Sequence, residues 1–366
     1  MKREIRNPSI PLTQKWIDRF LRIRKQISKT WHKTKDENLL YAIYDLDISA
    51  STFNILEFMV NAECEANRND KSGFAIVFVP SSNNPNLSWK EYDSVVDSIG
   101  RQWKFQNIVI PLTSLYEKCK GIFILPQRSD VTLFVQGREV YPDLYDGINL
   151  RAIDVKGFYS KLDRPNMFKG LRAPEQGLRY VKEWLLKNQI KDPIVTISIR
   201  EFDFDKVRNS NIKSWSQFAI YLRSNGYHPV VIPDTAVAFG ENHQFEGIKV
   251  FKECAWNLGL RLSLHESAFV NFFVDHGCSQ MAVFNPQCKY IRMNEWTKAE
   301  ESIVATKEAF QLHYDKKIGD NYKFATPGQW LCYKPDSFEN IVEEFERFVR
   351  AQKSQAINEA SSRSTN

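Results

Sequence analysis

A charged pair follows the first buried strand expected in the second half of the chain. The strand is Ile194–Ile199, Arg200 and Glu201 come directly after it, and Arg208 lies a few residues further on. An arginine guanidinium is a planar fork of donors that suits phosphate oxygens. Because open α/β sheets bind ligands at the carboxyl ends of their strands, these residues predict a site for a phosphorylated ligand.

Polar residues continue this site towards the next helix. Asn209 and Asn211 supply hydrogen-bond donors and a helix start, which favours an anion through the helix dipole. Asp234 follows the next expected strand, His228–Pro233, and belongs to the same group of ligand-binding candidates. The alternative interpretation is a structural salt bridge within the charged pair and an ordinary cap on the helix.

A polar turn containing a glycine spans Asp275–Gln280. Gly277 lets the backbone approach a ligand closely. A histidine side chain ordinarily titrates near neutral pH, so His276 is a candidate general acid or base, with Asp275 as the group that orients it. The alternative for His276 is a structural role. The candidates for ligand contact in this turn are Asp275, Gly277, Ser279 and Gln280.

Two carboxylates stand at the end of the first expected strand, Leu39–Leu46. Asp45 and Asp47 precede a helix that is expected to run to about Ala66. Either carboxylate is a candidate general base that deprotonates an acceptor hydroxyl. The alternative for Asp47 is that it caps the helix.

Several common signatures are absent from the sequence. It contains neither of the glycine-rich phosphate motifs, GxGxxG and GxxxxGK[ST], and we identify no DxD pair of the kind that holds a metal-bound diphosphate in single-domain transferases. The six cysteines are scattered without metal-ligand spacing and are expected to be reduced thiols. We therefore expect no metal site.

The order of strands and helices predicts an α/β protein of two Rossmann-like domains that face each other across a cleft. The expected parts are a basic amphipathic helix at 1–35, a first domain at 36–150, a linker at 151–172, a second domain at 173–351 and a disordered tail at 352–366. The further expected strands are Phe74–Pro80, Asn107–Pro111, Ile122–Leu125, Val131–Val135, Ile248–Phe251, Met281–Phe284 and Tyr290–Met293, and the further expected helices are Ala173–Asn188, Ser214–Asn225, Leu264–Phe273 and Phe338–Ala351.

Composition narrows the class of protein. The chain has 366 residues, of which 43% are hydrophobic and 26% charged, with a net charge of +6 and no long basic stripe. These values are typical of a soluble globular protein and argue against a nucleic-acid partner. No secretory signal is evident, so we expect a cytoplasmic protein. The helix at 1–35 either contacts an anionic membrane surface peripherally or packs on the body of the protein.

The second half of the chain resembles bacterial surface-polysaccharide proteins of the GT-B glycosyltransferase type. More loosely, it is similar to the donor domains of heptosyltransferases and of the α-1,6-fucosyltransferase group. The resemblance implies that Arg200 contacts the donor diphosphate and that Gly277 and Ser279 lie beside the nucleotide. The segments that carry it are Ile194–Arg200, Arg208–Asn211, Trp215, Phe218–Ala219, Asp234–Thr235, Asp275–Gln280 and Phe324–Pro327.

The resemblance implies a metal-independent glycosyltransferase that moves a sugar from a nucleotide-activated donor to a surface glycan or a lipid-linked glycan. The nucleotide sugar is then a substrate, and no cofactor is expected. One alternative is a nucleotide-sugar 2-epimerase. Another is a non-catalytic protein that binds nucleotide sugars or glycans.

Overall fold

The computed structural model describes residues 38–82, 92, 94–148, 155–240, 243–293 and 317–363, so the helix predicted at 1–35 lies outside the described residues. The chain folds into two compact units. Unit 1 comprises Met1–Ala50, Asn61–Leu87 and Lys118–Ile153, and unit 2 comprises Ser51–Val60, Ser88–Glu117 and Asp154–Asn366. The segments 51–60 and 88–117 therefore belong to unit 2, whereas the sequence predicted 36–150 as one domain.

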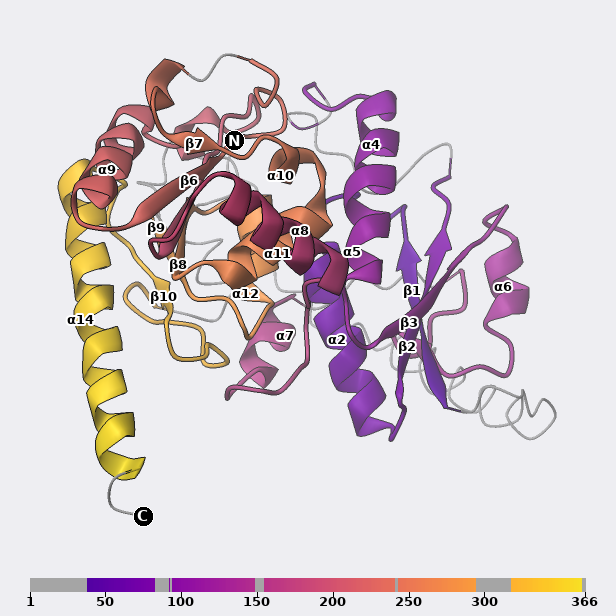
Figure 1. Ribbon diagram of the computed structural model, residues 1–366. Coiled ribbons are helices and arrows are strands. Elements are labelled where there is room, and N and C mark those ends of the chain that lie inside the picture. Colours follow the sequence, from indigo (N-terminus) through magenta and orange to yellow (C-terminus); the bar gives the residue numbers. More distant parts are fainter. Residues whose placement is uncertain are drawn as a thin grey trace. The chain divides into compact units, whose positions relative to one another are not determined.

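Unit 1 is built on a parallel four-stranded sheet with the strand order β3-β2-β1-β4 (Figure 1). The two central strands are almost entirely buried because they consist of continuous apolar residues. The elements are β1 (Leu39–Asp45), β2 (Gly73–Val79), β3 (Cys119–Ile124), β4 (Val140–Tyr141), the helix α6 (Asp130–Phe134) and the second part of α2 (Ile55–Arg68).

Two strands predicted in the first half of the chain are helical. Asn107–Pro111 falls in a π-helix, η1 (Phe105–Val109), and the start of α5 (Ile110–Ser114). Val131–Val135 falls in and just after α6. Both predictions were wrong because a short apolar run has the same composition in a strand and in a buried helix.

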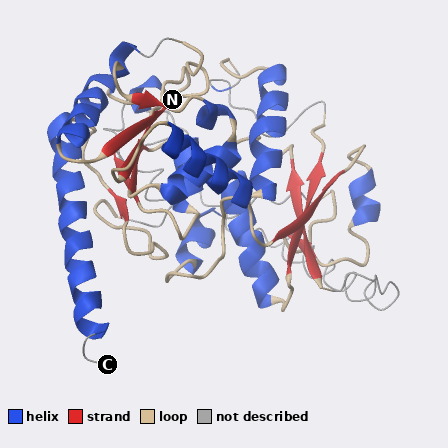
Figure 2. Ribbon diagram, in the orientation of Figure 1, coloured by secondary structure: helices blue, strands red, loops and turns tan. Residues whose placement is uncertain are grey.

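Unit 2 is built on a parallel six-stranded sheet with the order β10-β9-β8-β5-β6-β7, shown in red among its helices in Figure 2. Its strands are β5 (Ile194–Ser198), β6 (His228–Ile232), β7 (Lys249–Val250), β8 (Val270–Val274), β9 (Tyr290–Met293) and β10 (Gln329–Leu331). Its helices are α4 (Ser98–Lys104), η1, α5, α7 (Val155–Lys161), α8 (Glu175–Lys187), η2 (Lys206–Arg208), α9 (Ile212–Ser224), η3 (His243–Phe245), α10 (Glu253–Trp256), α11 (Leu258–Ser267), η4 (Gly277–Ser279), α12 (Gln280–Val283) and α14 (Phe338–Arg363).

A buried polar cluster joins the two central strands of this sheet. The Asn271 side chain accepts from the Thr196 hydroxyl at 2.5 Å and lies 2.6 Å from Nδ1 of His265. Its amide nitrogen donates to the carbonyls of His265 and Lys289, each at 2.9 Å. Burial lowers the pKa of His265 to about 3, so its ring is neutral at physiological pH. Each polar group of the Asn271 side chain thus has a partner inside the core.

Three boundaries predicted in the second half are wrong. The helix predicted at Leu264–Phe273 is the end of α11 followed by β8, and the strand predicted around Met281–Phe284 is the short helix α12. The tail after 351 continues α14 to Arg363, because alanine, glutamine and glutamate in this stretch are good helix formers.

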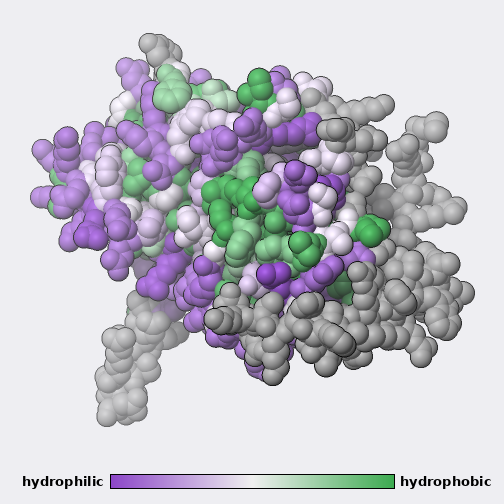
Figure 3. Space-filling view, turned by 90° about the vertical axis from the view of Figure 1, so that its right-hand side faces the viewer, coloured by the Kyte–Doolittle hydropathy of each residue, from purple (hydrophilic) through white to green (hydrophobic). Residues whose placement is uncertain are grey.

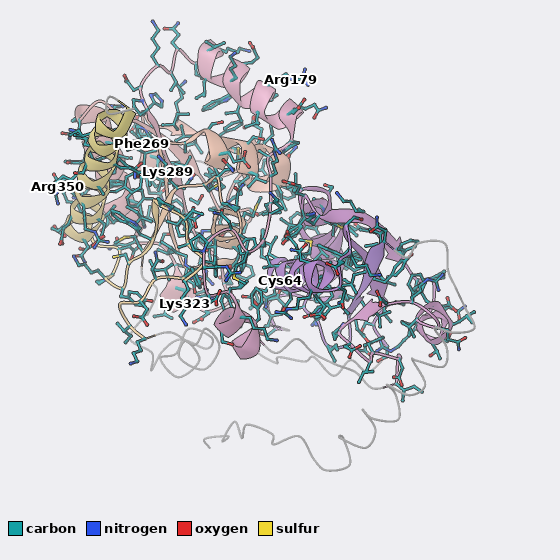
Figure 4. All side chains as sticks on the ribbon, turned by 90° about the horizontal axis from the view of Figure 1, so that it is seen from below. Cys64, Arg179, Phe269, Lys289, Lys323 and Arg350 are labelled. Carbon is teal, nitrogen blue, oxygen red and sulfur yellow. The ribbon has the colours of Figure 1, made fainter. Side chains whose placement is uncertain are left out.

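The first half of α14 packs on the second sheet. The ring of Phe269 meets that of Phe348 edge-on at 5.5 Å, and Lys289 Nζ donates to Gln352 at 2.6 Å; Figure 4 labels Phe269, Lys289 and Arg350 in this region. These contacts explain why the amphipathic part of this helix was predictable from its apolar spacing.

Some apolar side chains remain exposed on unit 1. Figure 3 views the side that lies on the right in Figure 1 and shows hydrophobic residues gathered near its middle. The exposed apolar residues of unit 1 include Ile122, Phe123, Ile124 and Leu133.

Within the described residues, no helix is both long enough and apolar enough to cross a bilayer.

Candidate functional site

The carboxyl ends of β1 and β2 in unit 1 hold Asp45 in a dense hydrogen-bonded cluster. Arg128 binds it with both ends of its guanidinium, Nη1 to Oδ1 at 2.7 Å and Nη2 to Oδ2 at 2.6 Å. The Tyr145 hydroxyl donates to Oδ2 at 2.5 Å, and the Asp47 amide donates to Oδ1 at 2.9 Å. Burial and the bond to Asp45 raise the pKa of Tyr145. With 1% of its surface exposed, Asp45 holds the cluster together.

Asp47 is buried beside it but is less fully bonded. Its Oδ1 accepts from the Ser81 hydroxyl at 2.9 Å and from the Ser82 amide at 2.7 Å, and its Oδ2 lies 3.2 Å from Arg128 Nη1. Burial raises the pKa of Asp47, but the bonds from Ser82 and Ser81 outweigh burial and leave it below its ordinary value. Asp47 is therefore an ionised carboxylate at neutral pH. It does not cap α2, whose first residue is Ile55.

In unit 2, the carboxyl ends of β5, β6 and β8 carry the other predicted residues. Arg200 directs its guanidinium into its own loop. Nη1 donates to the Asp205 carbonyl at 3.1 Å and to the Asn209 side chain, and Nη2 donates to the Phe204 carbonyl at 2.6 Å. Burial and the neighbouring Arg208 lower the pKa of Arg200 to about 10, so it stays charged at neutral pH. These bonds fold the loop after β5, and ligand contact by Arg200 stays a prediction.

The remaining residues of this loop have local roles. The Asn209 side chain also donates to the Phe202 carbonyl at 3.2 Å and accepts from the Phe202 amide at 3.1 Å. Asn211 caps α9 by accepting from the Ser214 amide at 3.3 Å. The Glu201 amide donates to Asp234 Oδ2 at 3.1 Å. Among the described residues, no ion pair joins Glu201 to Arg200, so the salt-bridge alternative is not observed.

Asp275 joins two arginines at the end of β8. Arg208 Nη2 donates to its Oδ2 at 3.0 Å and to its carbonyl at 3.0 Å, and Arg292 Nη1 lies 3.5 Å from its Oδ1. Burial raises the pKa of Asp275, but Arg208 and Arg292 outweigh burial and lower it overall. Asp275 therefore neutralises buried cations and makes no described hydrogen bond to the His276 ring.

The His276 ring is held as a hydrogen-bond donor. Its Nδ1 accepts from the Cys278 amide at 3.1 Å, and burial together with the nearby Arg261 and Arg200 lowers its pKa well below the ordinary value. A neutral ring that accepts at Nδ1 carries its proton on Nε2. His276 can therefore donate Nε2–H to a ligand, but it is not free to take up a proton at neutral pH.

The rest of the 275–280 loop is tightly packed. The Ser279 hydroxyl donates to the His276 carbonyl at 2.6 Å. A Cβ on Gly277 would lie 2.7 Å from the ring of Phe53, so a larger residue would have to displace that ring. The loop thus packs directly against the segment that precedes α2.

Four buried polar atoms in this part of unit 2 have no hydrogen-bond partner among the described residues. Two of them, Nε of Arg208 and Nε2 of His276, are donors by the chemistry given above. Buried polar groups in proteins are nearly always satisfied, so exceptions mark strain or a ligand site. The four atoms are Ser198 Oγ, Arg208 Nε, His276 Nε2 and Gln280 Oε1. The structure thus brings the predicted Arg208, His276 and Gln280 to one edge of the sheet.

Glu57, on the first turn of α2, was missed by the sequence analysis. Its Oε1 accepts from the Tyr159 hydroxyl at 2.7 Å, and Arg292 and Asp275 lie close enough to influence its charge. Burial raises the pKa of Glu57 to about 7 from its ordinary 4.5, and the bond from Tyr159 opposes this only in part. No signal in the sequence marks this carboxyl, because it lies on an ordinary helix.

Glu57→Gln should make the protein less sensitive to alkaline pH. A carboxyl whose pKa is raised by folding stabilises the protein below pH 4.5, and this contribution is lost as pH rises from 4.5 to 7. At 1.36 kcal/mol per pKa unit the loss is about 3 kcal/mol. Urea unfolding should therefore show a higher free energy of unfolding for Glu57→Gln than for the wild type at pH 8, and no such difference at pH 4.5. The exposed Glu183→Gln is the control, and an equal effect of Glu57→Gln at both pH values would contradict this account.

Among the described residues, no group of three or more histidine, cysteine, aspartate or glutamate side chains is arranged to hold a metal ion. The chemistry at the edge of the second sheet is that of hydrogen-bond donors and fixed charges. Such an arrangement suits an anionic ligand that offers several oxygen acceptors.

Comparison with known proteins gives a structural likeness alone. No family model matches the chain, and no curated protein matches it. Solved structures that match include a glycosyl transferase family 9 protein from Veillonella parvula DSM 2008, with a TM-score of 0.52 and 11% identity over 86% of this chain and 97% of that one. They also include the E. coli ADP-heptose LPS heptosyltransferase II, with a TM-score of 0.47 and 11% identity over 86% and 99% of the two chains. The two parallel sheets and the first of these matches show that the chain has the α/β fold of GT-B glycosyltransferases.

Proposed function

We propose that this protein is a glycosyltransferase that transfers a sugar from a nucleotide-activated donor to a glycan acceptor. The observation that carries the proposal is the pair of buried donors, Arg208 Nε–H and His276 Nε2–H, at the carboxyl edge of the second sheet. A leaving nucleoside diphosphate offers oxygen acceptors and gains charge as the bond to the sugar breaks. Fixed donors at that position stabilise the developing charge.

The fold supports the same proposal. The Veillonella protein of the same fold is described as a glycosyl transferase of family 9. Side chains and backbone dipoles can neutralise a leaving diphosphate without a metal ion. We therefore propose a metal-independent reaction. A cytoplasmic location and a surface-glycan or lipid-linked acceptor complete the proposal.

On the acceptor side, we propose Asp47 as the proton acceptor. In the reaction, the acceptor oxygen forms a bond to the anomeric carbon, the bond from that carbon to the diphosphate breaks, and the hydroxyl proton passes to the carboxylate. Asp47 suits this role better than Asp45 because Asp45 is fully engaged by Arg128, Tyr145 and the backbone. His276 suits it less because its ring is held as a donor.

A panel of radiolabelled nucleotide sugars tests the proposal. The purified protein should bind at least one nucleoside diphosphate and transfer or hydrolyse the matching sugar, with the same rate in excess chelator as without it. Product analysis without an acceptor separates transfer from epimerisation, because an epimerase changes the sugar and leaves it on the nucleotide. A protein that binds no nucleotide and consumes no donor is not a glycosyltransferase of this kind.

A further inference from the structure

Lys104, the last residue of α4, is a partly buried cation that pairs with no carboxylate among the described residues. Its Nζ lies 5.1 Å from the ring centroid of Phe202 and 5.7 Å from that of Tyr92. In the part of the chain that the structure describes, no acidic side chain comes within ion-pair distance of it. Burial lowers the pKa of Lys104, although Cys278 and Asp234 act in the opposite direction. An ammonium group in this setting has lost much of its hydration and has not replaced it with an ion pair.

The neighbours of Lys104 place it at the candidate site. Phe202 belongs to the loop after β5, Asp234 follows β6, and Cys278 lies in the loop after β8. The amide of Cys278 is the group that fixes the His276 ring, whose Nε2–H is one of the unsatisfied donors. Lys104 therefore lies at the same edge of the sheet as these donors.

The arginines at this edge already bind protein oxygens. Arg200 binds the carbonyls of Phe204 and Asp205, and the Nη2 of Arg208 binds Asp275. The charge of Arg200 is also offset by three nearby carboxylates, since Asp234, Asp205 and Asp275 all favour its charged form, whereas Asp234 alone among the carboxylates acts in this way on Lys104. A ligand with several negative charges would therefore interact more strongly with a cation that has no such protein partners.

We propose that Lys104 is the cation that binds the donor diphosphate. Nε of Arg208 and Nε2 of His276 would donate hydrogen bonds to the same diphosphate. This inference rests on the proposed function. An ammonium is a compact point charge with three donors that can reach oxygens of both phosphates at once. The Phe202 and Tyr92 rings hold the cation by their negative faces while leaving its N–H groups available. Lys104 should therefore distinguish a nucleoside diphosphate from the corresponding monophosphate.

Calorimetry on Lys104→Met tests this assignment. The probes are ADP, GDP, UDP and CDP, their monophosphates and inorganic pyrophosphate. For the diphosphate that the wild type binds, the affinity should fall at least about tenfold, as expected for the loss of a charge-assisted contact. Affinity for its monophosphate should change by less than about threefold, since one phosphate retains the two fixed donors. Lys104→Arg keeps the charge and should retain part of the binding.

The controls separate this inference from the proposed function. Lys213→Met, an exposed lysine on α9, should bind like the wild type. A wild type that binds none of the probes overturns the proposed function and the inference with it. A wild type that binds a diphosphate while Lys104→Met binds it equally well overturns the inference alone. An equal loss for monophosphate and diphosphate overturns the diphosphate assignment. Should the methionine variant unfold, Lys104→Gln repeats the measurement.

Discussion

Replacing Asp47 with asparagine should slow sugar transfer by about 10²- to 10⁴-fold, the usual contribution of a general base. Asparagine keeps the Oδ1 that accepts from Ser81 and Ser82, so the local fold should persist. It removes the proton acceptor, and the affinity for the nucleotide should not change. Single-turnover rates with the donor found in the panel, together with calorimetry, give the two quantities.

Asp45→Asn is the matched comparison, because it changes the neighbouring carboxylate in the same way. Here the amide would face the Arg128 guanidinium, whose two bonds to Asp45 are 2.7 and 2.6 Å long. We expect a loss of at most about 3 kcal/mol in stability, because the variant breaks a buried ion pair while Asp47 Oδ2, 3.2 Å from Arg128 Nη1, still offsets part of the arginine charge. The side chain of Arg128 is 23% exposed, which keeps the loss at the low end of the range. Wild-type turnover by Asp47→Asn would show that another group accepts the proton.

Asp275→Asn should destabilise unit 2 by about 3 kcal/mol, because it removes the carboxylate that pairs with the buried Arg292 and the partly buried Arg208, although Arg208 keeps a longer pair with Asp205 at 3.9 Å. The side chain of Arg292 is 1% exposed and that of Arg208 is 15% exposed. Urea unfolding measures the loss, and hydrogen exchange of the β8 and β9 peptides locates it in unit 2.

The control for this variant is Asp203→Asn, which breaks an exposed pair with Lys206. Such surface pairs contribute at most about 1 kcal/mol. If the two variants lost the same small amount, the charges of Arg208 and Arg292 would have to be balanced by groups other than Asp275.

Much of the sheet structure was predictable because buried parallel strands are continuous apolar runs. The strands β1, β2, β5, β6 and β9 were predicted within one or two residues of their observed ends. The failures came from runs too short to reveal a period, such as Val131–Val135 and Met281–Phe284. In such segments the tertiary environment decides between helix and strand.

The site was predictable only in part, for a different physical reason. Strand ends predict a ligand-binding edge, and the residues predicted there include Arg208, His276 and Gln280, which carry unsatisfied buried polar atoms. The partners of these residues come from elements distant in sequence, and a partner has no local signal. Arg128 meets Asp45 from 83 residues away, and Lys104 and Glu57 belong to segments that the sequence assigned to the other domain. The hydrogen bonds from Arg200 to the carbonyls of its own loop could not be predicted either, because they depend on how that loop folds.

The buried Asn271 cluster bears on how the chain avoids misfolding. All residues of β5 and β8 are buried, so a pairing shifted by one residue would bury nearly the same apolar surface. Apolar burial alone would therefore discriminate weakly between the correct and the shifted pairing. A shift would carry the Asn271 amide to the other face of the sheet, away from Thr196 and His265. Each buried polar group left without a hydrogen bond would then lower the stability of the shifted pairing by about 1–3 kcal/mol. The hydrogen bonds of a single polar side chain thus make the correct pairing of β5 and β8 more stable than the shifted one.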